Sequence, residues 1–450
     1  MKDTIFTLIS ENPIQIPKLR ETLTAMNIVD VGDIFEDLDM ERTIQIFRLL
    51  PKSIAANVFA HIVHEKQQII IEALTDVEVG GIIEGLFMDD AVDFIEEMPA
   101  NVVNRVLSNV TPERRDVINR LLKYPEESVG SIMTTEYMSL REDFTVLEAF
   151  ARMRENRVKG IHTCYIVRRD KILLGAVSLK SLLLAKEHER VGDLVRTHVI
   201  SAQTHDDQEI AAGLFRKYDF LSLPVVDKEN RLVGIITVDD MVEIVEEEAT
   251  EDFERMAGIS PSEEPYLRTG VFMHSRGRIG WLMVLMLAAT FTEMIIGGFE
   301  DALLLIPILG TLIPLLMDSG GNAGSQTATL VIRSMALDEI HFKDILKVWW
   351  LETRVAFLCG LLLAGINALR MIIFAPADTD PTYTAVILTV SVTLVVVALI
   401  ANTLGCLLPM IGKKIKIDPA VFATPMITTV KDTVTLMIFF YLARAIIGGI

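Results

Sequence analysis

The chain has 450 residues, enough for two or three domains, and carries 61 acidic against 42 basic side chains. The net charge of −19 argues against a nucleic-acid partner, because phosphate binding needs a surplus of Lys and Arg, and it is compatible with cations. Residues 1–278 hold 49 acidic and 32 basic side chains, whereas residues 279–450 hold only 12 and 10 and are mostly apolar. The composition predicts an acidic soluble half followed by a membrane half.

The soluble half is expected to stay in the cytosol. Its N-terminal segment is too polar for a secretory signal peptide. The three cysteines, Cys164, Cys359 and Cys406, show neither CxxC spacing nor a disulfide framework, which fits a reducing compartment.

Residues 1–125 have a helical periodicity with no strand-like alternation. The predicted amphipathic helices are Glu41–Leu50, Ile54–Val63, Glu65–Ala73, Glu78–Leu86, Asp89–Glu97 and Asn101–Leu107. Short helices at a loose period are typical of an α-solenoid, which usually provides a regulatory surface.

Residues 130–250 contain an internal repeat of about 60 residues, in which a helix, a strand, a Gly-led strand and a second helix follow each other. The first copy comprises Val146–Arg154, Thr163–Val167, Leu174–Ser178 and Ser181–Ala185, and the second Glu209–Phe215, Leu223–Asp227, Gly234–Asp240 and Met241–Glu247. The pattern resembles a tandem pair of cystathionine-β-synthase-type (CBS) domains, βαββα sensor modules. In the second copy Thr237 and Asp240 match that family's ribose-binding pattern, whereas Ser181 replaces the acid in the first.

Acidic residues concentrate around the second copy, where they form either a solvated helix face or a site for a hard divalent cation that relieves their repulsion. They are Asp206, Asp207, Glu209, Asp219, Asp239, Asp240, Glu243, Glu246, Glu247, Glu248, Glu251 and Asp252. Asp89, Asp90 and Asp93 are candidates for facing carboxylates. A helix over Val245–Ala257 leads to the membrane half and is a candidate mechanical link.

Five segments of the membrane half are apolar enough to span ~30 Å of hydrocarbon. They are Gly280–Phe299, a stretch from Ala302 through Pro307 and Pro314 into a polar interruption, Val355–Phe374, Ala385–Ile411 and Ala420–Ile447. Basic residues precede the first span and lie in alternate loops, so the prediction is a cytoplasmic N-terminus and an external C-terminus.

The polar interruption is the glycine-rich run from Gly320 to Gln326. Non-helical backbone at membrane depth is tolerated only where protein or a watery cavity surrounds it. We therefore predict non-helical backbone facing a pore, with Asn322 and Gln326 as lining candidates, and a cytoplasmic loop is the alternative.

Asp432 is expected close to the bilayer centre. An intramembrane carboxylate is costly and indicates a functional site. The alternative is a structural pair with Lys431, which we do not favour because neighbours on a helix point about 100° apart. Pro425 frees backbone carbonyls that are further candidates for pore lining.

No catalytic machinery is predicted. The sequence has no GxxxxGK[ST] phosphate loop and no Asp-Lys-Thr-Gly run, so passive ion flux is favoured over ATP-driven pumping or any enzyme activity.

Taken together, these features resemble the MgtE family of magnesium channels over essentially the whole chain. The most specific marks are the 320–326 run, Asp418-Pro419-Ala420 and the segment from Thr424 to Asp432. The resemblance implies a homodimer in the plasma (inner) membrane, with its pore along the dimer axis and Mg²⁺ as both transported and regulatory ion. The implied domains are a helical N domain (1–128), two CBS domains (129–192 and 193–250), a connecting helix and linker (251–278) and a five-helix pore domain (279–450).

The resemblance also implies site residues. It places the pore carboxylate at Asp432 and a cytoplasmic-mouth carboxylate at Asp418. The regulatory Mg²⁺ ligands would be Asp89, Asp93, Asp207, Glu209, Asp219, Asp240, Glu243, Glu248, Glu251 and Asp252. Phe220 and Asp239, with Thr237, match positions that hold ATP in some relatives. Two departures are Asn57, where relatives can have Glu, and Lys431 beside the pore acid.

Other functions stay open at this point. One is a CBS-bearing transporter of Mn²⁺ or Co²⁺, and a CBS-bearing chloride channel is disfavoured because it would need ten or more helices. Another is a membrane-anchored adenylate sensor, which leaves Asp432 and the 320–326 run without a purpose.

Overall fold

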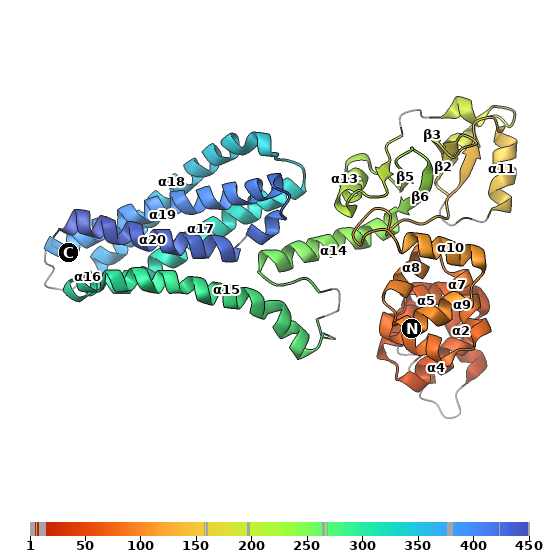
Figure 1. Cartoon of the computed structure of the whole chain (residues 1–450), viewed down its shortest axis with the longest axis horizontal. Helices are drawn as coiled ribbons and strands as arrows, with labels where there is room; N and C mark the ends of the chain where they lie inside the picture. Colours follow the sequence, from red (N-terminus) through yellow and green to blue (C-terminus); the bar gives the residue numbers. More distant parts are fainter. Residues whose placement is uncertain are drawn as a thin grey trace. The chain divides into compact units, whose positions relative to one another are not determined.

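The structure is a computed structural model of the 450-residue chain (Figure 1). It describes residues 5, 7, 8, 15–156, 158, 161–195, 199–262, 266, 267, 269–375, 381–422 and 424–448. The chain forms two compact units, Met1–Val245 and Glu246–Ile450, which are described separately below.

Short helices make up the first part of unit 1. They are α2 (Ile16–Ala25), α3 (Ile28–Ile34), η1 (Phe35–Asp37), α4 (Met40–Leu49), α5 (Lys52–Ala60), α6 (His64–Ala73), α7 (Asp76–Gly85), α8 (Met88–Glu96), α9 (Ala100–Ser108) and α10 (Pro112–Leu121). Local capping explains several starts: Asp39 accepts from the backbone N–H of Arg42, and Thr75 with Glu78 forms a capping box. All six predicted helices are confirmed, and α2, α3 and α10 are additional.

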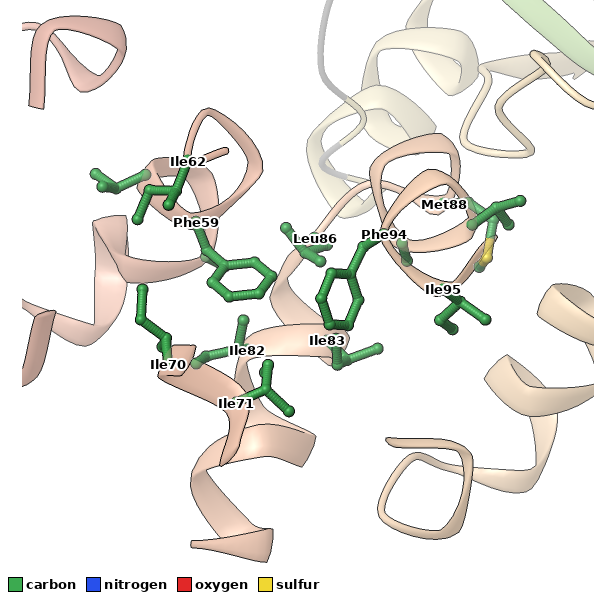
Figure 2. Packing of buried hydrophobic residues seen from close by; sticks show 14 of the residues in the cluster. Phe59, Ile62, Ile70, Ile71, Ile82, Ile83, Leu86, Met88, Phe94 and Ile95 are labelled. Atoms are coloured by element: carbon green, nitrogen blue, oxygen red, sulfur yellow. The ribbon is translucent and has the colours of Figure 1, made fainter. Parts of the chain in front are cut away.

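Apolar faces of these helices pack into one core (Figure 2). Phe59 of α5 and Phe94 of α8 meet edge to face with ring centroids 5.1 Å apart, a favoured aromatic geometry. Ile71 and Ile83 lie beside the two rings. The same core continues to Val129 and to the second sheet, so the helical part and the second CBS motif share buried surface.

Two three-stranded sheets with identical topology confirm the internal repeat. The first motif comprises β1 (Ser139–Arg141), α11 (Val146–Glu155), β2 (Thr163–Val167), β3 (Leu173–Ser178) and α12 (Leu179–Leu184). The second comprises β4 (Ala202–Gln203), α13 (Gln208–Tyr218), β5 (Ser222–Val226), β6 (Leu232–Thr237) and α14 (Val238–Met256). The short helix η2 (Val191–Leu194) lies between the two motifs in sequence. In each sheet the first pair is parallel and the second antiparallel, and a register shift falls at the same place.

The two motifs join through reciprocal backbone hydrogen bonds. Leu173 N donates to Asn230 O at 3.0 Å, and Leu232 N donates to Lys171 O at 2.9 Å. Lys171 and Asn230 both have positive φ, 66° and 61°, so the two turns are equivalent in backbone conformation as well as in pairing. This symmetry is the arrangement expected of a duplicated module.

Helix α14 corrects two details of the prediction. The strand ends at Thr237, and Val238 already begins the helix; the hydroxyl of Thr237 donates to the carboxylate of Asp240 in the first turn. The second helix of the CBS motif and the predicted connecting helix are one continuous element, which starts in unit 1 and ends in unit 2.

Unit 2 is a bundle of long helices. Its elements are α15 (Val271–Gly298), α16 (Glu300–Leu305), α17 (Ile308–Ala336), η3 (Phe342–Asp344), α18 (Ile345–Ile373), α19 (Pro381–Lys414), η4 (Pro419–Phe422) and α20 (Thr424–Ile447). Helix α19 packs against α17, α18 and α20 (Figure 1). Among the described residues, three helical segments are long and apolar enough to cross a membrane: Val271–Gly298, Phe342–Ile373 and Pro381–Lys414. The number of five spans stays a prediction.

The 320–326 run is helical, and the prediction of non-helical backbone there was wrong. It lies inside the 29-residue helix α17. Its glycines permit close helix packing: a Cβ at Gly405 of α19 would lie 2.4 Å from the carbonyl oxygen of Gly324, and a Cβ at Gly320 would lie 2.4 Å from Val397 Cγ1. Small residues let helix backbones approach closely in membranes, and this tertiary packing outweighs the low helix propensity of glycine.

Replacement of Gly405 by Ala should therefore destabilise unit 2. Because the added Cβ meets a backbone oxygen that cannot move aside, we expect Gly405→Ala to cost about 1–3 kcal/mol and to lower the apparent Tm in detergent. Gly365→Ala in α18 is the matched control, since a Cβ there has nothing within 4 Å. Equal Tm values for the two variants would contradict the close approach of α17 and α19.

Candidate functional site

Asp432 lies in α20 next to a buried lysine. Its side chain is 24% exposed, whereas that of Lys431 is 1% exposed. Lys431 Nζ lies 2.6 Å from Asp432 Oδ1 and also donates to the carbonyl oxygen of Met317 in α17. Lys431 and Asp432 therefore do pair, contrary to the expectation from helix geometry, because the long lysine side chain bends back to the carboxylate from its own position on the helix.

A polar stripe runs along the face of α17 that points away from the glycines. Asp318, Asn322 and Gln326 recur every four residues and are all exposed in the single chain, whereas Gly320 and Gly324 are buried. The two lining candidates therefore lie on one face of one helix. The side chain of Pro425, the third candidate, lies outside the described residues.

Asp418 binds the end of helix α14. Arg255 forms ion pairs with both Asp418 and Glu251, and Asp418 also accepts from the backbone N–H of Ala420 at 2.8 Å. Burial, followed by the charge of Asp418, raises the pKa of Asp252. Three predicted ligand residues, Glu251, Asp252 and Asp418, thus lie close together in unit 2, and Arg255 lies among them.

A second group of carboxylates forms in unit 1, where α8 meets the start of α14. Burial raises the pKa of Asp89 to about 8, and the charges of Asp90, Asp240 and Asp93 contribute in that order. Oδ1 of Asp89 is buried and accepts no hydrogen bond. Burial also raises the pKa of Asp240 to about 6, against the opposing hydrogen bond from Thr237. Burial and the negative charges of neighbouring carboxylates both make ionisation of Asp89 unfavourable, and a bound cation would offset this unfavourable free energy.

Other predicted ligands have local structural roles. Asp207 is the N-cap of α13 and accepts from Glu209 N at 2.8 Å, and Asp219 ends the same helix in the left-handed conformation. Glu243 and Glu248 lie along α14. Within the described ranges, no group of three or more His, Cys, Asp or Glu residues has the arrangement of a preformed metal site.

The candidate nucleotide-binding residues lie within the second CBS motif. Phe220 stacks on Tyr218 with ring centroids 5.4 Å apart. Thr237 and Asp239 lie at the junction of β6 and α14. In the first motif, the hydroxyls of Ser178 and Ser181 bond each other at 2.8 Å, in the position that Thr237 and Asp240 take in the second.

Sequence reasoning missed Glu352 of α18. Its Oε2 accepts from Thr327 Oγ1 of α17 at 2.9 Å and from Asn402 Nδ2 of α19 at 3.2 Å. This carboxylate therefore ties three helices together. An acid within an apolar segment was the available signal, since such residues usually find polar partners inside the bundle.

Comparison with known proteins decides the family. The profile of the MgtE divalent cation transporters matches residues 313–442, that of the MgtE intracellular N domain residues 26–127, and that of the CBS domain residues 129–188 and 191–247. The chain is 33% identical over 437 residues to the "Magnesium transporter MgtE" of Thermus thermophilus, covering 96% of each protein. The chain belongs to the MgtE family.

Solved structures of MgtE soluble regions agree with this result. The crystal structure of the soluble part of a magnesium transporter matches with a TM-score of 0.52 and 28% identity, over 55% of this chain and 100% of that one. The cytosolic domain of the Mg²⁺ channel MgtE in complex with ATP matches with a TM-score of 0.51 and 32% identity, over 54% and 100%. This MgtE chain is thus a membrane transporter and not an enzyme, with an N domain and a CBS pair of the fold predicted.

The carboxylate group around Asp89 predicts a specific pH dependence of stability without divalent cations. A folded pKa of about 8 lies above the ~3.9 of an ordinary Asp, so the folded state keeps a proton that the unfolded state releases. Stability should therefore fall as pH rises from about 4 to about 8. Asp89→Asn should flatten this fall and be more stable than the parent chain at pH 8 by about 1 kcal/mol or more.

Pulse proteolysis of the full chain in urea with EDTA, between pH 5 and 8, measures this difference. Asp116→Asn, at an exposed carboxylate of α10, is the control and should follow the parent chain. Parallel pH curves for Asp89→Asn and the parent would rule out a strained carboxylate at that position.

Proposed function

We propose that the chain is a Mg²⁺-selective channel that imports the ion down its electrochemical gradient, with Asp432 as the pore carboxylate. The position of Asp432 carries this proposal: it lies ~12 Å along α20 from the first residue, and it is partly exposed in a bundle of apolar helices. The polar stripe of α17 is the second support, because exposed Asp318, Asn322 and Gln326 are costly against lipid but suit a water-filled path.

The ion would pass largely hydrated. Mg²⁺ gives up water reluctantly and keeps several waters in its octahedral shell. A carboxylate that is only partly exposed can hold such an ion through water instead of binding it directly. In this scheme Asn322 and Gln326 donate and accept hydrogen bonds with the waters of the shell.

The pore would need a second copy of the chain. Helix α15 has no buried residue, and its apolar side chains, such as Leu282 and Met286, are exposed. Among the described residues, no other element buries the polar stripe of α17 either. A homodimer with the stripes facing each other would pair two Asp432 side chains across a common path, with the N-terminus in the cytoplasm and the C-terminus outside.

Gating would use the carboxylate group of unit 1. Mg²⁺ bound by Asp89, Asp93 and Asp240 would replace the proton that Asp89 otherwise keeps, and so would favour the state in which α8 and α14 are together. Since α14 continues to Arg255, which holds Asp418, a change at its first turn reaches the predicted pore mouth through one helix. A ligand shifts such an equilibrium only by its difference in affinity between the two states.

ATP is a candidate modulator at Phe220, Thr237 and Asp239. A relative's cytosolic domain has been solved with ATP, and the second CBS motif here has the matching Thr237–Asp240 pair. Regulation by ATP would add to the Mg²⁺ response without driving transport.

Asp432→Asn should reduce Mg²⁺ uptake into liposomes by at least about tenfold, because it removes the carboxylate that holds the hydrated ion and leaves the buried charge of Lys431 without its paired acid. Asp301→Asn is the control, because Asp301 is an exposed acid in the first turn of α16. Competition by Mn²⁺, Co²⁺ and Ca²⁺ in the same assay tests the choice of ion. Normal uptake by Asp432→Asn would remove the basis of the proposed pore.

The gating scheme makes a separate prediction. Asp240→Asn should raise the internal Mg²⁺ concentration that stops uptake by about fivefold or more, because coupling between sites is typically worth 1–3 kcal/mol. The maximal uptake at low internal Mg²⁺ should stay the same. A closing concentration equal to that of the parent chain would exclude Asp240 from the sensor.

A further inference from the structure

Lys431 is a buried cation in a segment where charge is expensive. Its side chain is 1% exposed, among the largest fully buried side chains of the described chain. Charged groups at such depth persist only with partners that compensate the lost hydration. Lys431 has two: the carboxylate of Asp432 and the carbonyl oxygen of Met317.

The lysine occupies a slot that glycines of α17 provide. A Cβ at Gly320 would lie 2.9 Å from Lys431 Cδ, and a Cβ at Gly321 would lie 3.2 Å from Nζ. Any larger residue at these two positions would push the amine away from its place. The slot therefore fixes the amine between α17 and the carboxylate of α20.

We propose that Lys431 is a specificity-determining residue, which neutralises the pore carboxylate from inside the protein and so weakens its hold on divalent cations. This inference rests on the proposed function, in which Asp432 is the pore acid. With the amine in place, each Asp432 is half of an ion pair, and a dimer presents two neutral pairs instead of two free negative charges. At the level of Asp432 the ion then meets oriented oxygens without a strong net charge.

Weak binding suits rapid transport of a hydrated ion. A conducting site must attract an ion enough to admit it and hold it loosely enough to release it. Ca²⁺ accepts more direct oxygen ligands than Mg²⁺ and loses water more easily, so a free carboxylate pair would retain Ca²⁺ and block the path. Lys431 thus favours the ion that stays hydrated.

Measurement of Mg²⁺ uptake by the full chain in liposomes tests this role, with Lys431→Met and Lys431→Arg as a matched pair. Met keeps a long unbranched side chain without charge, and Arg keeps the charge. Lys431→Met should lower the half-saturating Mg²⁺ concentration by about tenfold and make block by Ca²⁺ more potent by a similar factor, because a full charge beside the ion is removed. Lys431→Arg should keep both values within about threefold of the parent chain.

Gly321→Ala provides a second test if a Lys431 variant does not assemble. Its Cβ meets only the lysine amine and Thr428 Cγ2, at 3.2 and 3.5 Å, so it displaces the amine without removing the charge. It should lower the half-saturating concentration in the same direction as Lys431→Met, by a smaller factor.

The outcomes separate this inference from the proposed function. If Asp432→Asn stops uptake while Lys431→Met, or Gly321→Ala in its place, leaves affinity and Ca²⁺ block unchanged, the inference is overturned and the pore assignment stands. If Asp432→Asn leaves uptake intact, the proposed function fails first. A purely structural lysine would change the amount of folded protein without changing these ion preferences.

Discussion

The close approach of α17 to α19 and α20 is the constraint on which the packing of unit 2 depends. It exists because glycines replace larger side chains at the contacts: Gly324 lies against Gly405, and Gly320 with Gly321 makes room for Lys431. Lys431 in turn crosses from α20 to the backbone of α17 and pairs with Asp432. The position of the predicted pore acid, the burial of its counter-charge and the outward face of Asn322 and Gln326 all follow from this one packing arrangement.

Both units contain carboxylates that are partly or fully removed from water, and the two units balance the negative charge of these carboxylates in different ways. In unit 2, Asp432 has Lys431 and Asp418 has Arg255, so basic side chains of the protein balance the charge. In unit 1, Asp89 sits among other carboxylates, and its raised pKa means that a proton balances it instead. A proton is exchangeable and a side chain is not. The uncompensated group therefore suits the sensor proposed above, and the compensated groups suit fixed structure around the proposed path.

Much of the fold could be predicted because local patterns determine it. The helical periodicity of residues 41–107 and the repeat with strands at Thr163–Val167 and Ser222–Val226 are properties of short stretches. The 320–326 run could not be predicted in the same way, because clustered glycine favours a loop locally and only tertiary packing makes it helical. The pairing of Lys431 with Asp432 depends on the slot in α17, and the partners of Glu352 lie 25 and 50 residues away in sequence. Such features need the packed structure.

If Asp432 lies on an ion path, the face of α17 that carries Asn322 and Gln326 should line that path and be accessible to water-soluble reagents. In a chain whose three native cysteines are replaced, Asn322→Cys would be treated with a charged, membrane-impermeant thiol reagent while Mg²⁺ uptake is followed. Leu362→Cys, at an exposed apolar position of α18, is the control. The reagent should block uptake through Asn322→Cys and leave Leu362→Cys unaffected. An Asn322→Cys chain that stays unmodified, or that transports normally once modified, would contradict it.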